Sequence, residues 1–169
     1  GCTEITEVIC PEGLRKIGIG AFFKCSNLVR IHFPKEMDYI AEGAFNGCTK
    51  LNHLEIPQGI EVLNRNLFYD CENLSCIKFP VNIRKIGYDA FHNTSYMNRF
   101  MESDKTELYI NNWLIHYKTD ENLILNIKHG TIGIAGQDSI NWSKPRKRSA
   151  VILPDTLKYL CQNALNMYA

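Results

Sequence analysis

The chain has 169 residues, of which 45% are hydrophobic and 22% are charged, and its formal net charge is +1. This composition is typical of an ordinary folded domain and excludes a disordered or collagen-like chain. The near-neutral charge gives no electrostatic reason to expect nucleic acid as a partner. No apolar run approaches the roughly 18 to 20 residues that a membrane span requires, and no signal peptide is visible.

A repeat of 23 residues runs through the first part of the chain, up to about residue 97. Proline, phenylalanine, cysteine and aliphatic residues all recur at this interval. A period in the twenties that is kept in many columns indicates a solenoid, in which each repeat forms one rung and buries its apolar edge against the next. Four of the columns are Pro11, Pro34, Pro57 and Pro80; Phe22, Phe45, Phe68 and Phe91; Cys2, Cys25, Cys48 and Cys71; and Val8, Ile31, Leu54, Ile77 and Phe100.

Each repeat predicts one short strand followed by turns. In the second repeat, Ile31 and Phe33 alternate with polar neighbours, which is the pattern of a strand with one buried face. Pro34 follows directly and ends the strand, because proline has no N–H to donate to a ladder. Further along, Ala44 and Phe45 supply one small and one large core residue. We therefore predict short parallel strands, stacked about 4.8 Å apart.

The register is lost after Met97, in the segment 98–122. There the apolar stretches Leu108–Ile110 and Trp113–Tyr117 flank a pair of asparagines, which predicts a β-hairpin inserted between the fourth and fifth rungs. Within this hairpin, Trp113 and Tyr109 serve either ordinary packing or an aromatic contact with a partner.

Two degenerate copies of the repeat follow in the segment 123–169. Lys128 takes the place of the proline in the first copy, and Pro154 keeps it in the second. These positions are 26 residues apart, so this rung carries about three extra residues, which we place in the loop 141–149. The resulting domain organisation is four regular repeats in 1–97, an insert in 98–122 and two truncated repeats in 123–169. Since neither end shows the polar cap of a complete solenoid, we expect a piece of a longer array.

The phrases Ile-Pro-x-x-Ile-x-x-Ile-x-x-x-Ala-Phe and Gly-Cys-x-x-Leu resemble the BspA-like leucine-rich repeats, a 23-residue class of bacterial and protist surface proteins. The match is strong over 11–97 and weak over 123–165. The resemblance implies a right-handed solenoid with turns and short helical or 3₁₀ pieces, a secreted or cell-surface location, and adhesion to host matrix proteins or other cells. It carries no catalytic motif. The departures, which are Lys128 for proline, Asp138-Ser139 for Ala-Phe and Cys161 for glycine, predict irregular final rungs.

The seven cysteines divide into a core set and an outward residue. One cysteine per rung recurs in the column of Cys25, so these side chains run parallel into the core, where free thiols pack as small hydrophobes. Cys10 takes a core position as well. Cys76 instead falls on the outward face, next to His53 of the preceding rung.

The outward strand positions form the predicted binding surface. They vary from rung to rung while the core columns stay constant, which suits recognition of a protein or glycan ligand by a rigid surface. A second candidate is a basic loop that could bind heparin-like glycans or acidic partners, or could simply be solvated. The surface consists of Glu7, Arg30, His32, His53, Glu55, Cys76, Lys78 and Arg99, and the loop residues are Lys144, Arg146, Lys147 and Arg148.

The leading hypothesis is a non-catalytic binding module that needs no cofactor. One alternative is a structural spacer in a larger surface protein. A second alternative is a zinc or thiol site, because His32, His53, Glu55 and Cys76 would present two imidazoles, a carboxylate and a thiolate close together. A nucleophilic pair of His53 and Cys76 would also require an orienting group and an oxyanion hole, and the sequence shows neither.

Overall fold

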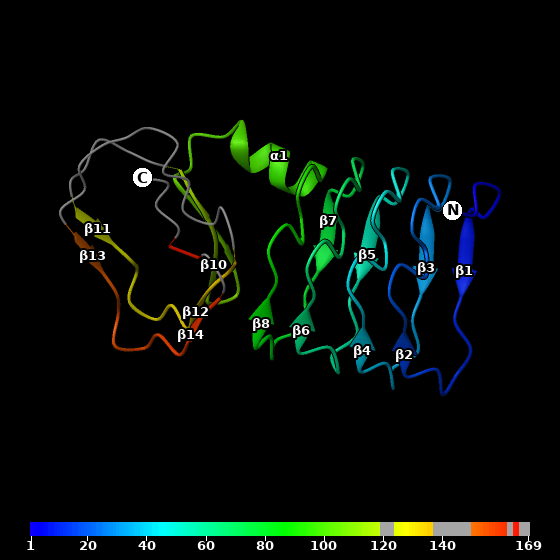
Figure 1. Ribbon diagram of the computed structural model, residues 1–169, viewed down its shortest axis with the longest axis horizontal. Coiled ribbons are helices and arrows are strands. Elements are labelled where there is room, and N and C mark those ends of the chain that lie inside the picture. Colours follow the sequence, from blue (N-terminus) through cyan, green and yellow to red (C-terminus); the bar gives the residue numbers. More distant parts are fainter. Residues whose placement is uncertain (119–123, 137–149, 162–163, 166–169) are drawn as a thin grey trace. The chain divides into compact units, whose positions relative to one another are not determined.

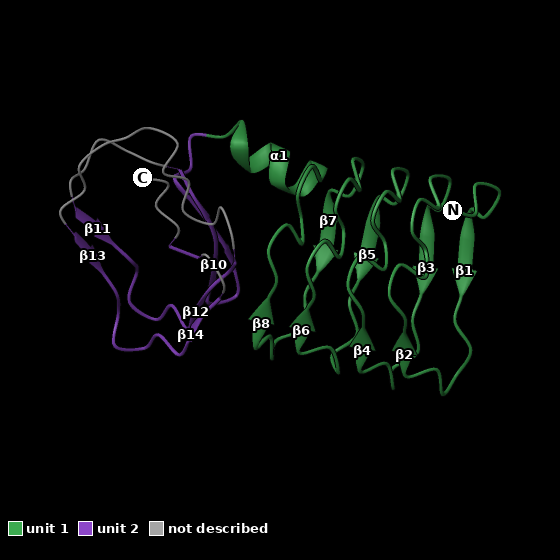
Figure 2. Cartoon of the chain, viewed as in Figure 1, with its two compact units in different colours: residues 1–103 green, residues 104–169 purple. Residues whose placement is uncertain are grey.

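The computed structural model describes residues 1–118, 124–136, 150–161 and 164–165 (Figure 1). The chain forms two compact units, Gly1–Ser103 and Asp104–Ala169 (Figure 2). Each unit is built from stacked short strands joined by turns. In the described residues the predicted helical pieces reduce to one helix, α1 (Ser95–Met101), and the other turns of the coil are tight hydrogen-bonded turns.

The first unit contains two rows of parallel strands, one on each side of the coil (Figure 1). Strands of the first and second repeats pair with each other, as do strands of the third and fourth, so Val8 lies opposite Ile31 and Leu54 lies opposite Ile77. The prediction of one strand per repeat was incomplete, because each repeat also contributes a two-residue strand to a second row. The first row consists of β1 (Glu7–Ile9), β3 (Arg30–His32), β5 (His53–Glu55) and β7 (Cys76–Lys78), and the second of β2 (Lys16–Ile17), β4 (Tyr39–Ile40), β6 (Val62–Leu63) and β8 (Lys85–Ile86).

The repeat columns build the core of this unit, as predicted. The phenylalanine rings of successive rungs stack on one another, with centroids 5.2 Å apart for Phe22 and Phe45, 5.8 Å for Phe45 and Phe68, and 5.8 Å for Phe68 and Phe91. The last three of these rings are at most 2% exposed. Continuous stacking accounts for the phenylalanine at this position in each of the four regular repeats.

The members of the cysteine column that lie in the inner rungs are buried. No disulfide joins any of the seven cysteines of the chain, all of which lie in the described residues. Cys25, Cys48 and Cys71 are at most 1% exposed, whereas Cys2 is exposed at the open first rung, contrary to the prediction that it is buried. The thiols of Cys48 and Cys71 each donate at 3.1 Å to the carbonyl of a phenylalanine in the preceding rung. Burial raises the pKa of Cys48 to about 12, and burial likewise raises the pKa of Cys71.

The parallel ladder is interrupted between the second and third rungs. The amides of Cys10 and Ile56 each donate at 3.0 Å to the next rung, but among the described residues the equivalent bond from Phe33 is absent. In the second row the Asn64 side-chain amide donates to the Ile40 carbonyl at 2.7 Å. Between the first and second rungs, and between the third and fourth, a backbone amide makes the equivalent bond. The continuous sheet that the repeat predicts is therefore divided into pairs of strands.

Helix α1 stands at the point where the repeat register was predicted to be lost. Thr94, which occupies the cysteine column, caps the helix because its hydroxyl accepts from the Met97 amide at 3.1 Å. Ser103 occupies the proline column, so nothing there enforces the end of a strand. The predicted core position of Phe100 is therefore kept, but Arg99 does not belong to the outward strand positions as predicted. Phe100 is buried from the helix, and Arg99 is exposed in its last turn.

The second unit confirms the predicted hairpin. Strands β9 (Glu107–Ile110) and β10 (Trp113–Tyr117) are antiparallel, with Asn111 at a φ of 52° in the turn. The other edge of β10 pairs in parallel with β12 (Gly133–Ile134), which pairs with β14 (Tyr159–Leu160).

The two degenerate copies align as predicted. Strand β11 (Ile124–Asn126) pairs in parallel with β13 (Ala150–Ile152), and Leu125 lies opposite Val151, an offset of 26 residues. The loop in which we placed the extra residues lies outside the described residues.

Candidate binding surface

The outward residues of the first strand row form one exposed surface, which we call the strand face. The alternation of each three-residue strand sends the central side chain into the core and the two flanking side chains outward. In β3 and β5 the central Ile31 and Leu54 are buried while their neighbours are exposed. The strand face consists of Glu7, Ile9, Arg30, His32, His53, Glu55, Cys76 and Lys78.

Side-chain contacts between rungs engage both carboxylates of the strand face. Glu7 lies 3.1 Å from the His32 imidazole, and Glu55 lies 3.1 Å from the Lys78 ammonium. Arg30 makes no ion pair with any described residue. Exposed pairs of this kind contribute at most about 1 kcal/mol each to stability, so their main effect is to give both carboxylates of the face a partner while Arg30 has no ion pair with a described residue.

The four residues considered for zinc do not form a metal site. His53 lies opposite Cys76 in the β5–β7 register, as predicted. His32 and Glu55, however, are engaged in the two ion pairs with other partners. Within the part of the chain that the structure describes, no group of three or more His, Cys, Asp or Glu side chains could hold a metal ion.

The proposed nucleophilic pair lacks the surroundings of a catalytic site. His53 and Cys76 are exposed on neighbouring strands, and neither side chain makes a hydrogen bond to a described residue. A nucleophile and its base are normally joined by a hydrogen bond, with a third group that orients the base. His53 and Cys76 are therefore neighbours on adjacent strands without the hydrogen bond of a catalytic pair.

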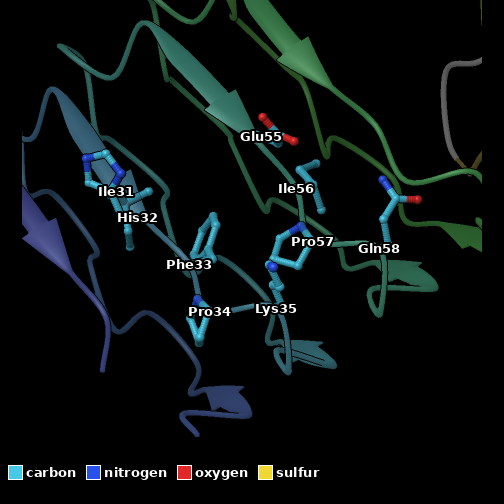
Figure 3. Close-up of a pocket in the computed structure, with 9 residues that line it drawn as sticks. All are labelled: Ile31, His32, Phe33, Pro34, Lys35, Glu55, Ile56, Pro57 and Gln58. Atoms are coloured by element: carbon cyan, nitrogen blue, oxygen red, sulfur yellow. The ribbon is translucent and has the colours of Figure 1, made fainter. Parts of the chain in front are cut away.

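A groove opens on the first unit where the strand ladder is interrupted. Its volume is about 510 Å³, and it lies between the ends of β3 and β5 and the turns that follow them (Figure 3). Both strand ends contribute an outward polar residue of the strand face, His32 and Glu55, followed by an apolar residue and a proline. The complete lining is Ile31, His32, Phe33, Pro34, Lys35, Glu55, Ile56, Pro57 and Gln58.

The repeat pattern did not predict this groove. Regular spacing implies equal contacts at each junction, and the second and third repeats keep all the core columns. In the second strand row of the same junction, Asn64 takes a position where the first and fourth repeats have Gly18 and Gly87. Its side chain takes the Ile40 carbonyl that would otherwise accept a ladder bond.

The remaining sequence candidates lie away from the strand face. The basic loop of Lys144, Arg146, Lys147 and Arg148 lies outside the described residues. Trp113 is fully buried and stacks on Tyr159 with a centroid distance of 5.5 Å, so its role is packing.

Tyr109 also serves packing. Its hydroxyl lies 3.2 Å from the Thr131 hydroxyl, and the Lys128 ammonium lies 5.6 Å from its ring centroid. No helix among the described residues is long and apolar enough to cross a membrane.

Comparisons with known proteins agree with this architecture. Residues 1–117 match the BspA type leucine rich repeat region, a family description that covers six copies. No curated protein matches the chain. A leucine rich cell surface protein from Faecalibacterium prausnitzii has a similar structure, with a TM-score of 0.56 and 22% sequence identity over 94% of this chain and 51% of that protein.

A leucine-rich repeat protein from Bacteroides ovatus is similar at a TM-score of 0.55 and 19% identity, over 92% of this chain and 33% of that protein. The chain thus spans about half the length of the first and a third of the second. At these identities the likeness concerns the fold, whereas the sequence match covers more than two thirds of the chain. The chain belongs to the BspA type leucine-rich repeat family.

Proposed function

We propose that this chain is a non-catalytic binding module of a cell-surface or secreted protein, and that it recognises a protein or glycan ligand through the strand face. The observation that carries the proposal is that the residues that pack the core and the residues that are exposed to a ligand occupy separate positions of the repeat. Core columns repeat at every rung, while the exposed positions beside them change from rung to rung. A rigid surface of this kind loses little conformational entropy when it binds.

The Arg30 guanidinium of the strand face supports a ligand with acidic groups, such as a matrix protein or an acidic glycan. Arg30 is unpaired within the described residues, and the only carboxylates of the face, Glu7 and Glu55, are already paired. Complementary charge favours encounter and specificity more than affinity. The described residues show no catalytic constellation that would compete with this reading.

The experiment is binding of the whole chain to immobilised matrix proteins and glycans. The test variant is Arg30→Glu with Lys78→Glu. The matched control is Lys16→Glu with Lys85→Glu, which reverses two exposed lysines on the second strand row. We expect saturable binding that weakens roughly tenfold in the test variant and stays unchanged in the control.

Equal binding by both variants would place the site away from the strand face. Absence of binding across the whole panel would contradict the proposal and favour the spacer.

A further inference from the structure

We propose that the groove between the second and third rungs takes an apolar side chain from a protein partner, and that Lys35 pairs with an acidic residue next to it in the partner's sequence. This inference rests on the proposed binding function and names the ligand chemistry of one part of that surface. It thereby chooses an apolar–acidic peptide segment over a glycan.

The lining favours an apolar anchor. Five of the nine lining residues are apolar, namely Ile31, Phe33, Pro34, Ile56 and Pro57. Interface hot spots commonly consist of one side chain that fills a desolvated pocket of this kind. The Phe33 ring is turned edge-on to Phe45, at a centroid distance of 6.0 Å and an interplanar angle of 76°. That packing holds the ring in place at the groove.

The charge of the rim selects an acidic neighbour. Of the charged side chains that line the groove, His32 is paired with Glu7 and Glu55 is paired with Lys78. The structure describes every lining residue, and Lys35 is the one charged member without an ion pair. A carboxylate on the occupant would give this ammonium a partner.

The spacing of the strands excludes a different mode of peptide binding. A strand inserted between β3 and β5 would require them to stand about 9.6 Å apart, twice the usual separation. Their Cα atoms approach within 8 Å. The gap therefore admits a side chain but not a backbone, even though the Phe33 amide makes no ladder bond there.

The test is a titration of the ¹⁵N-labelled whole chain, followed by two-dimensional NMR. The probe is N-acetyl-Leu-Asp-amide, and its neutral match is N-acetyl-Leu-Asn-amide. We expect saturable shifts of the Phe33, Glu55 and Gln58 amides, with roughly fivefold weaker binding of the neutral probe, as one exposed charge pair would give. Lys35→Gln should abolish this preference without unfolding the chain, because Lys35 is exposed. The control Lys85→Gln should preserve it.

Three results would overturn the inference. The first is that the Leu-Asp probe gives no saturable shift at the groove, and the second is that both probes bind equally to the unchanged chain. The third is that methyl glucuronide binds in the groove in a way that depends on Lys35, which would indicate an acidic glycan. Binding of the chain to the immobilised panel would survive each of these, so failure of the groove is distinguishable from failure of the proposed function.

Discussion

Removing one ring from the phenylalanine stack tests the repeat register most directly. Phe45 is fully buried between Phe22 and Phe68, and Phe33 packs edge-on against it. A buried Phe→Ala change typically costs about 3 to 5 kcal/mol of unfolding free energy. With three ring neighbours lost at once, we expect Phe45→Ala to fall at the upper end, about 4 to 5 kcal/mol.

Phe22→Ala is the matched control. Phe22 is only half-buried in the first rung and has one ring partner, Phe45, so its loss should be smaller, about 2 kcal/mol. The assay is urea denaturation followed by far-UV circular dichroism. With a slope of about 2 kcal/mol per molar urea, the midpoint should fall by about 2 M for Phe45→Ala and by about 1 M for the control. Equal shifts, or none for Phe45→Ala, would refute the assignment of the column to a continuous core stack.

Three further changes probe the same unit. A Cβ on Gly59 would lie 2.6 Å from the Met37 carbonyl oxygen, whereas nothing lies within 4 Å of one on Gly18. Gly59→Ala should therefore lower the unfolding free energy by roughly 1 to 3 kcal/mol, and Gly18→Ala should be near neutral. Equal denaturation midpoints would disprove the close approach. Because the pKa of Cys48 is raised in the folded chain, the thiol ionises in the unfolded chain first. Below about pH 9 the unfolding free energy should therefore not depend on this thiol, and it should fall as the pH rises toward about 12. Stability curves of the unchanged chain and Cys48→Ala should converge over that window, and parallel curves would contradict the prediction. Thr94→Ala should cost about 1 kcal/mol through the lost helix cap. Thr94→Ser should restore most of it, which thermal denaturation would check.

The sequence was sufficient to predict the three-residue strand of each regular repeat, its inward and outward positions, and the hairpin. Each of these follows from a local pattern, such as the alternation around Ile31 or the asparagine turn at Asn111. The second row of two-residue strands was not predicted. Helix α1 was missed although its signals were present. Thr94 replaces a cysteine and Ser103 replaces a proline, and these two changes supply a helix cap and remove a strand terminator.

The polar contacts of the strand face could not be derived from spacing alone. Vertical neighbours were predicted correctly, as the pairing of His53 with Cys76 shows. The side chains that meet are nevertheless decided by rotamers and by competition among charges. His32 contacts Glu7 of the preceding rung instead of Glu55, and this difference removes the zinc hypothesis.

The interrupted ladder shows how a regular solenoid can acquire a groove without losing its core. At the same junction where the strands are unpaired, the turn opposite keeps its backbone contact, since the Phe45 amide donates to the Leu67 carbonyl at 3.1 Å. The ring stack also continues through the junction, with Phe45 and Phe68 5.8 Å apart. The groove is thus confined to the ends of β3 and β5 in the first row. In the second row of the same junction, the Asn64 side chain donates to the Ile40 carbonyl in place of a backbone amide. Since hydrophobic stacking contributes most of the stability of a rung, a junction can lose ladder bonds at its strand ends and open a groove while the core stays continuous.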